Sequence, residues 1–97
     1  MINAILLDEK DNVVTCVKEI RAGEEVCYRT GTATASLTAR EKIPRCHKVA
    51  LADLREGDRV LKYGEMIGRL SRAVAAGCWV NEHNLYSVPR DYDSELV

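Results

Sequence analysis

The chain has 97 residues, of which 46% are hydrophobic and 30% are charged, as in a small globular domain rather than a disordered chain. Its formal net charge of -1 excludes the basic excess of a protein that binds nucleic acid mainly through phosphates. No apolar run approaches the roughly 18 residues that span a bilayer, and the N-terminus lacks the basic start of a signal peptide, so we expect a cytoplasmic protein without membrane contact.

The first half of the chain predicts β-strands. Residues 2–7 form an almost continuous apolar run, and residues 12–17 are rich in β-branched side chains. Residues 30–39 alternate Thr with small residues, which predicts one strand with a face toward solvent.

A ten-residue pattern occurs four times. Its fourth position is apolar, its seventh is Gly in three windows and Cys46 in the other, and its tenth is always Val; the windows are residues 17–26, 40–49, 51–60 and 71–80. Because Gly accepts a positive φ, each window predicts a tight turn followed by a short strand that ends in an inward-facing Val. Cys46 must then adopt a strained left-handed conformation or use another turn type. The irregular spacing favours a compact fold with repeated corners over a solenoid.

The second half predicts a hairpin and one further strand. Residues 59–62 and 66–70 flank a Tyr-Gly-Glu turn centred on Gly64, and residues 78–82 form the last strand candidate.

No long segment has helical periodicity, although residues 51–55 and 72–76 could each form a single helical turn. The predicted fold class is therefore mostly β with short helical turns. We expect one domain over residues 1–86 and a polar tail over residues 87–97, which contains a Pro and several acids.

Two polar corners, each with one histidine, are the candidate sites. His47 and Lys48 follow a predicted turn and could bind a carboxylate or a phosphate, while His83 lies between Glu82 and Asn84. An imidazole between a carboxylate and an amide could ligate a metal, act as a general base or bind a hydroxyl group. Both corners could equally be solvated surface. The four cysteines have no C-x-x-C spacing, which argues against a zinc site.

The two corners, with the repeat between them, resemble a known family. Residues 43–68 read IPRCHKVALADLREGDRVLKYGEMIG, and residues 77–84 read GCWVNEHN. These motifs resemble the SAF-type β-clip domain of the altronate and galactarate dehydratase family, to which the small subunit of sulfolactate sulfo-lyase is closely related. The resemblance implies a small β-clip domain over most of the chain.

The resemblance also implies functional residues. His47 and His83 would be catalytic, and His83 would also be a candidate metal ligand. Substrate contacts would come from residues in the matching motifs, which are Lys48, Lys62, Tyr63, Glu65 and Asn84. Cys46 stands where the family has Gly, and Asn81 stands where it usually has the first His of H-x-H-N. An amide is a poor ligand for Fe(II) or Mn(II), so Asn81 would weaken a metal site.

The activity implied by the resemblance is the dehydration of a sugar acid. The chain would be the small subunit of a metal-dependent hydro-lyase, inactive alone, with Fe(II) or Mn(II) held mainly by a separate large dehydratase subunit. The alternative is a non-catalytic SAF-type module that binds a sugar acid or stabilises a complex. Self-association stays open.

Overall fold

The computed structural model describes residues 1–87, so the predicted tail lies outside the described residues except for Ser87. Strands, and no helix, occur among the described residues, which confirms the mostly-β class. The strands are β1 (Ala4–Ile5), β2 (Val13–Cys16), β3 (Glu25–Thr30), β4 (Ala33–Thr38), β5 (Lys48–Ala50), β6 (Arg59–Lys62), β7 (Glu65–Leu70), β8 (Trp79–Val80) and β9 (Leu85–Tyr86).

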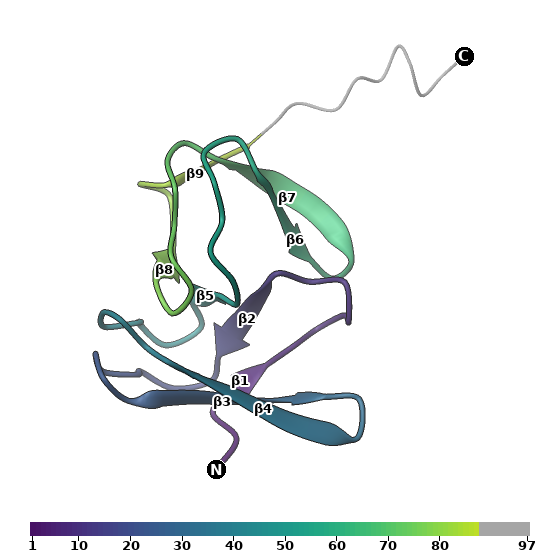
Figure 1. Cartoon of the computed structure of the whole chain (residues 1–97), viewed down its shortest axis with the longest axis vertical. Helices are drawn as coiled ribbons and strands as arrows, with labels where there is room; N and C mark the ends of the chain where they lie inside the picture. The colour runs from purple at the N-terminus through teal and green to yellow at the C-terminus, as the bar shows by residue number, and fades with distance from the viewer. Residues whose placement is uncertain (88–97) are drawn as a thin grey trace.

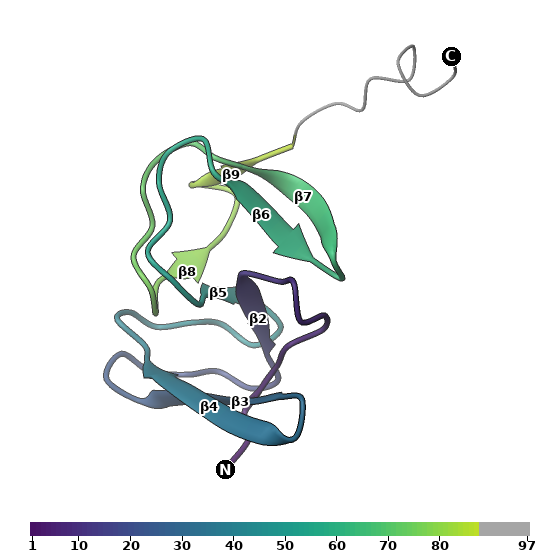
Figure 2. The ribbon, with the colours of Figure 1, turned by 45° about the vertical axis from the view of Figure 1, so that its right-hand side comes forward.

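The strands form three layers. A central antiparallel sheet with the order β1-β2-β5-β8 lies between the β3–β4 hairpin and a second sheet with the order β6-β7-β9 (Figures 1 and 2). Because both faces of the central sheet are covered, successive side chains of its strands enter different cores. Val14 and Val49 pack toward the β3–β4 hairpin, whereas Val13 and Ala50 pack toward β6 and β7.

The four repeated windows form the corners of this fold. Their seventh residues all have a positive φ, from 69° at Cys46 to 89° at Gly23 and Gly77, so Cys46 adopts the left-handed conformation. The valines at the tenth position of the windows are all fully buried, and each is the second residue of its own strand, which is β3, β5, β6 or β8. The prediction that each strand ends at its Val is therefore wrong for β3, β5 and β6, which continue beyond it.

The apolar fourth residues of the windows pair with one another. Ile20 and Ile43 exchange backbone hydrogen bonds of 3.0 and 2.7 Å, and Leu54 and Val74 exchange bonds of 2.8 and 2.9 Å. The expected helical turns at residues 51–55 and 72–76 are thus absent from the described chain. The Leu54 and Val74 amides are committed to a bridge between segments, which removes them from local helical bonding.

Three strand predictions also need correction. The strand expected over residues 2–7 shortens to β1. The chain reverses at Gly31, where φ is 65°, so residues 30–39 form the end of β3, a turn and β4 instead of one strand. The last strand candidate, residues 78–82, shortens to β8 because the chain turns immediately after Val80. The predicted hairpin is confirmed, but β7 begins at Glu65, so the turn consists of Tyr63 and Gly64 alone. Both residues have a positive φ, as a type I′ hairpin turn requires.

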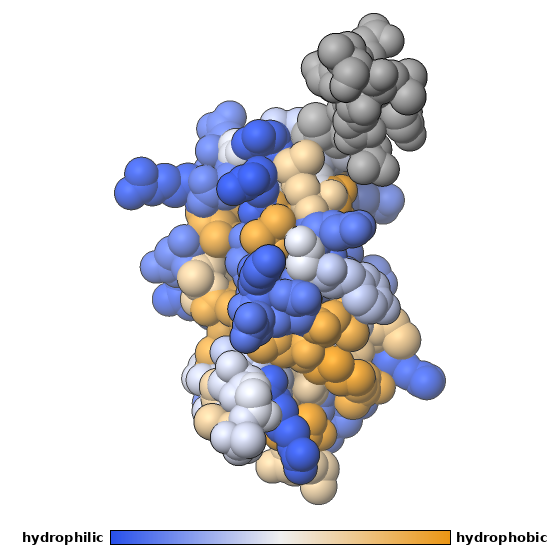
Figure 3. Space-filling view, turned by 90° about the vertical axis from the view of Figure 1, so that its right-hand side faces the viewer, coloured by the Kyte–Doolittle hydropathy of each residue, from blue (hydrophilic) through white to orange (hydrophobic). Residues whose placement is uncertain are grey.

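Part of the surface is apolar. Figure 3 shows hydrophobic side chains gathered across the lower middle of one face of the molecule. Large exposed apolar residues include Ile2, which precedes β1, Ile5, which is the last residue of β1, and Val17, which directly follows β2. Among the described residues, no helix has the length and apolar character needed to cross a membrane.

Candidate functional site

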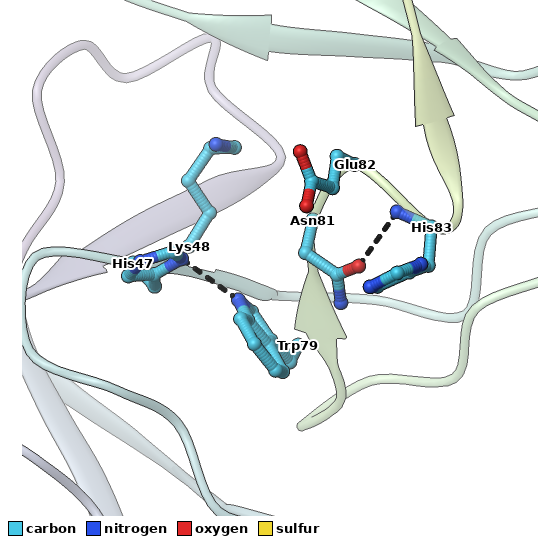
Figure 4. A pocket seen from close by; sticks show the side chains of 6 residues that line it. All are labelled: His47, Lys48, Trp79, Asn81, Glu82 and His83. Atoms are coloured by element: carbon cyan, nitrogen blue, oxygen red, sulfur yellow. Dashed lines mark hydrogen bonds between the residues drawn. The ribbon is translucent and has the colours of Figure 1, made fainter.

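The antiparallel pairing of β5 and β8 brings the two polar corners together. Lys48 lies opposite Val80 in this register, so the residue before β5 meets the segment that follows β8. The result is an open pocket of about 300 Å³ between the corners (Figure 4). Its lining residues are His47, Lys48, Trp79, Asn81, Glu82 and His83.

His47 contacts Trp79 directly. The indole Nε1 of Trp79 donates a hydrogen bond to Nδ1 of His47 across 3.0 Å. The ring centres are 5.2 Å apart with an interplanar angle of 78°, an edge-to-face arrangement that aromatic pairs favour. The contact links the corner before β5 to β8 and fixes one wall of the pocket.

Lys48 is a half-buried cation at the edge of this pocket. Burial lowers the pKa of its amine below the usual 10.5, and the positive charge of nearby Lys62 lowers it further. Both effects disfavour an uncompensated charge at this position, so a bound anion would relieve them. Lys48 is therefore the cationic group of the pocket, and Glu82 is the carboxylate in its lining.

The loop after β8 is held by its two asparagines. The Asn84 side chain is buried; its Oδ1 accepts the Asn81 N–H at 2.8 Å, and its Nδ2 donates to the carbonyl of Trp79 at 2.8 Å. The Oδ1 of Asn81 in turn accepts the backbone N–H of His83 at 2.7 Å. These bonds present the exposed side chains of Glu82 and His83 at the pocket.

The pocket does not contain a complete metal site. No group of three His, Cys, Asp or Glu side chains suited to a metal ion occurs within residues 1–87. Divalent Fe and Mn need several such ligands, so this part of the chain does not fit the metal by itself. His83 could contribute at most one ligand to a site completed from elsewhere.

The predicted site residues divide into two groups. His47, Lys48 and His83 line one pocket, and Lys62 lies close enough to affect Lys48. Three further candidates, all among the described residues, do not line this pocket. Tyr63 and Glu65 lie at the β6–β7 turn, and the buried Asn84 side chain supports the loop.

Sequence reasoning did not predict three of the lining residues as part of the site: Trp79, Asn81 and Glu82. Trp79 is the only tryptophan of the chain and lies within a polar corner, which was the available signal. A buried or half-buried indole N–H needs an acceptor, and His47 is the acceptor here.

The fold and the pocket define a small β-clip domain with a ligand-sized site at one corner. A family model described as the altronate/galactarate dehydratase SAF domain matches residues 2–88, and the chain belongs to this family.

Relatives fall into two kinds. Altronate dehydratase of Escherichia coli (strain K12) is 36% identical over 83 residues, which are 86% of this chain and 16% of that protein. Altronate dehydratase of Bacillus subtilis (strain 168) is 32% identical over 80 residues, 82% of this chain and 15% of that protein. The (2R)-sulfolactate sulfo-lyase subunit alpha of Chromohalobacter salexigens is 32% identical over 87 residues, 87% of this chain and 93% of that subunit. The chain therefore spans about one sixth of the altronate dehydratases it matches and nearly all of the sulfo-lyase subunit.

Proposed function

We propose that this chain is the small subunit of a sugar-acid dehydratase or a closely related lyase, acting with a separate large catalytic subunit. The observation that carries the proposal is the meeting of His47, Lys48 and His83 in one pocket, in a domain of the dehydratase family. The pocket combines a cation with two imidazole rings.

The chemistry of the pocket suits an elimination from a hydroxy acid. Loss of water requires a base for the proton next to the carboxylate and an acid for the departing hydroxyl group. Lys48 would bind the carboxylate, whose charge would compensate its own. His47 would contact the carboxylate or a hydroxyl group, and His83 would take part in proton transfer.

The extent of the relatives supports a subunit. The chain matches almost the full length of a protein named as subunit alpha, whereas in altronate dehydratases the same region is a small fraction of the whole. The exposed apolar area of Figure 3 is suited to packing against another chain. The divalent metal, Fe(II) or Mn(II), would be held mainly by the large subunit, since the described residues lack a full ligand set.

Reconstitution with a large dehydratase subunit tests this proposal. The two chains would be co-expressed, the complex isolated by size-exclusion chromatography, and turnover of altronate, galactarate and (2R)-sulfolactate measured. We expect turnover only in the complex. We expect His47→Ala, which removes a substrate contact, and His83→Ala, which removes a proton-transfer group, each to lower kcat by about 100-fold or more without loss of the complex.

A matched control is Arg45→Ala, which changes an exposed residue of the same corner outside the pocket lining. It should leave turnover nearly unchanged. If a double variant lacking both histidines kept full turnover, the catalytic roles would be wrong. The chain would then be the alternative, a non-catalytic module that binds a sugar acid or stabilises the complex.

A further inference from the structure

The hydrogen bond between Trp79 and His47 determines where the proton of a neutral His47 ring lies. An indole Nε1–H can only donate, so the imidazole nitrogen that it contacts must carry a lone pair. That nitrogen is Nδ1, at 3.0 Å from the indole nitrogen. A neutral imidazole has one protonated nitrogen, so the proton is on Nε2.

The main chain of each residue is held in place independently of this bond. The Trp79 backbone N–H donates to a carboxylate oxygen of Glu41 at 3.1 Å, and its carbonyl accepts the side chain of Asn84 at 2.8 Å. The His47 carbonyl accepts the backbone N–H of Cys16 at 2.9 Å. The indole and the imidazole therefore meet without further ordering of the main chain.

We propose that Trp79 is a positioning residue that fixes His47 as the Nε2–H tautomer and so makes it a hydrogen-bond donor to the pocket. Trp79 would act through His47 and would not need to touch a ligand. The tautomer follows from the geometry alone. Its consequence for the reaction rests on the proposed function.

Two groups beside His47 in the pocket are also hydrogen-bond donors. The Oδ1 of Asn81 is engaged by the His83 N–H, so the end of the amide not used in this bond is Nδ2, which can only donate (Figure 4). Lys48 supplies a third donor and the positive charge. Three donors around one pocket match a carboxylate or a hydroxyl oxygen, and Glu82 is the one carboxylate among the lining residues.

The tautomer separates the roles of the two histidines. A neutral His47 with its proton on Nε2 can donate a hydrogen bond from Nε2, but its Nε2 cannot accept a proton, and loss of the Nε2 proton would leave an imidazolate. In an elimination, His47 would therefore serve the departing hydroxyl group or the carboxylate. Proton removal next to the carboxylate would fall to His83 or to the large subunit.

Nitrogen-15 NMR of the imidazole rings tests the proposal without any substrate or partner. The spectra would be recorded on the full chain at mildly alkaline pH, where free imidazole is neutral. We expect the wild-type His47 ring to show an unprotonated Nδ1 and a protonated Nε2. In Trp79→Phe, which keeps an aromatic ring but removes the donor, the ring should become a mixture of tautomers. The indole N–H donates to His47 and not to His83, so His83 provides the control in the same spectra.

A second variant protects the test against misfolding of Trp79→Phe. In His47→Ala the Trp79 indole N–H should lose its acceptor, and its proton resonance should shift while its exchange with solvent becomes faster. The proposal is overturned if wild-type His47 carries its proton on Nδ1, or if neither variant changes the signals of the other ring. Because these readouts need no turnover, they stand or fall separately from the dehydratase assignment.

Discussion

The carboxylate of Asp11 binds the backbone of Gly64 across two layers of the fold. One carboxylate oxygen accepts the Gly64 N–H at 2.7 Å, and the other accepts the Tyr63 N–H at 3.0 Å. The backbone N–H of Asp8 donates to the same carboxylate at 3.1 Å. Asp11 is only 7% exposed, so its charge is compensated mainly by these backbone donors and it ties the segment before β2 to the β6–β7 turn.

Asp11→Ala should therefore destabilise the domain strongly. The change leaves backbone donors without their acceptor, and we expect the free energy of unfolding in urea to fall by about 3 kcal/mol. Asp53→Ala is the matched control, because Asp53 is exposed and accepts one backbone N–H, from Ala76. Its cost should stay near 1 kcal/mol or below, roughly that of a single solvated hydrogen bond. Equal losses in the two variants would contradict the anchoring role of Asp11.

Cys46→Gly should stabilise the domain. Cys46 has a φ of 69°, a conformation that costs a residue with a Cβ about 1–2 kcal/mol. Relief of this strain, reduced by the greater freedom of Gly in the unfolded chain, should raise the free energy of unfolding by about 0.5–1 kcal/mol. Cys46→Ala keeps the Cβ and should give no such gain in the same denaturation experiment. A gain of similar size in both variants would show that the thiol, not the backbone, is unfavourable here.

Two glycines with nearly the same φ should respond differently to a Cβ. Gly57 has a φ of 86° and open space around the added atom, so Gly57→Ala should cost only the backbone strain of about 1–2 kcal/mol. Gly77 has a φ of 89°, and an added Cβ would overlap the carbonyl oxygen of Thr38.

Gly77→Ala should consequently cost more than Gly57→Ala, by several kcal/mol, because the β4 backbone must move. Thermal unfolding followed by the fluorescence of Trp79, the only tryptophan, measures both variants. The native emission should also change in Gly77→Ala, since Trp79 follows the displaced turn. Equal melting temperatures for the two variants would rule out the close approach of Gly77 to β4.

Lys62→Gln should raise the pKa of the Lys48 amine. Burial is the larger cause of the low value and would remain, whereas the repulsion from Lys62 would disappear. The pKa should move up but stay below 10.5. A pH titration of the Lys48 side chain by NMR measures it, and Lys42→Gln, which removes a positive charge paired with Glu19 instead, is the control.

The lowered pKa of Lys48 also makes the free energy of unfolding depend on pH. Folded Lys48 loses its proton at a lower pH than the unfolded chain does, so the unfolded state binds more protons in the interval between the two pKa values. The free energy of unfolding contributed by Lys48 should therefore increase as pH rises through that interval. In Lys62→Gln the interval narrows and this increase should become smaller. An unchanged slope, with an unchanged Lys48 titration, would contradict the proximity of the two amines.

The corners of the fold could be predicted because their requirements are local. A positive φ at the seventh position and a buried Val at the tenth depend on residues within a single window. The pairing of Ile20 with Ile43, and of Leu54 with Val74, depends on distant segments. In isolation, Leu54 and Val74 suit a helical turn equally well. Their backbone hydrogen bonds to each other, between distant segments, exclude that turn.

The candidate site, too, could be predicted only where it depends on local sequence. His47 and His83 could be identified as members of two polar corners, but only the β5–β8 register places them in one pocket. Trp79 was not predicted as part of the site, since an indole in a strand is more often a core residue. Its role depends on the direction of one N–H, which a sequence does not contain.

The loop over residues 81–84 joins β8 of the central sheet to β9 of the β6-β7-β9 sheet. At the end of this loop, the Ser71 N–H donates a 2.9 Å hydrogen bond to the Asn84 carbonyl. The loop that forms one wall of the pocket is therefore anchored in both layers. By mass action, a molecule that binds the packed arrangement and not the separated one opposes its separation. The melting temperature of the domain and the occupancy of its pocket are consequently coupled quantities, and the melting curve is a binding assay for candidate ligands that needs no knowledge of the reaction.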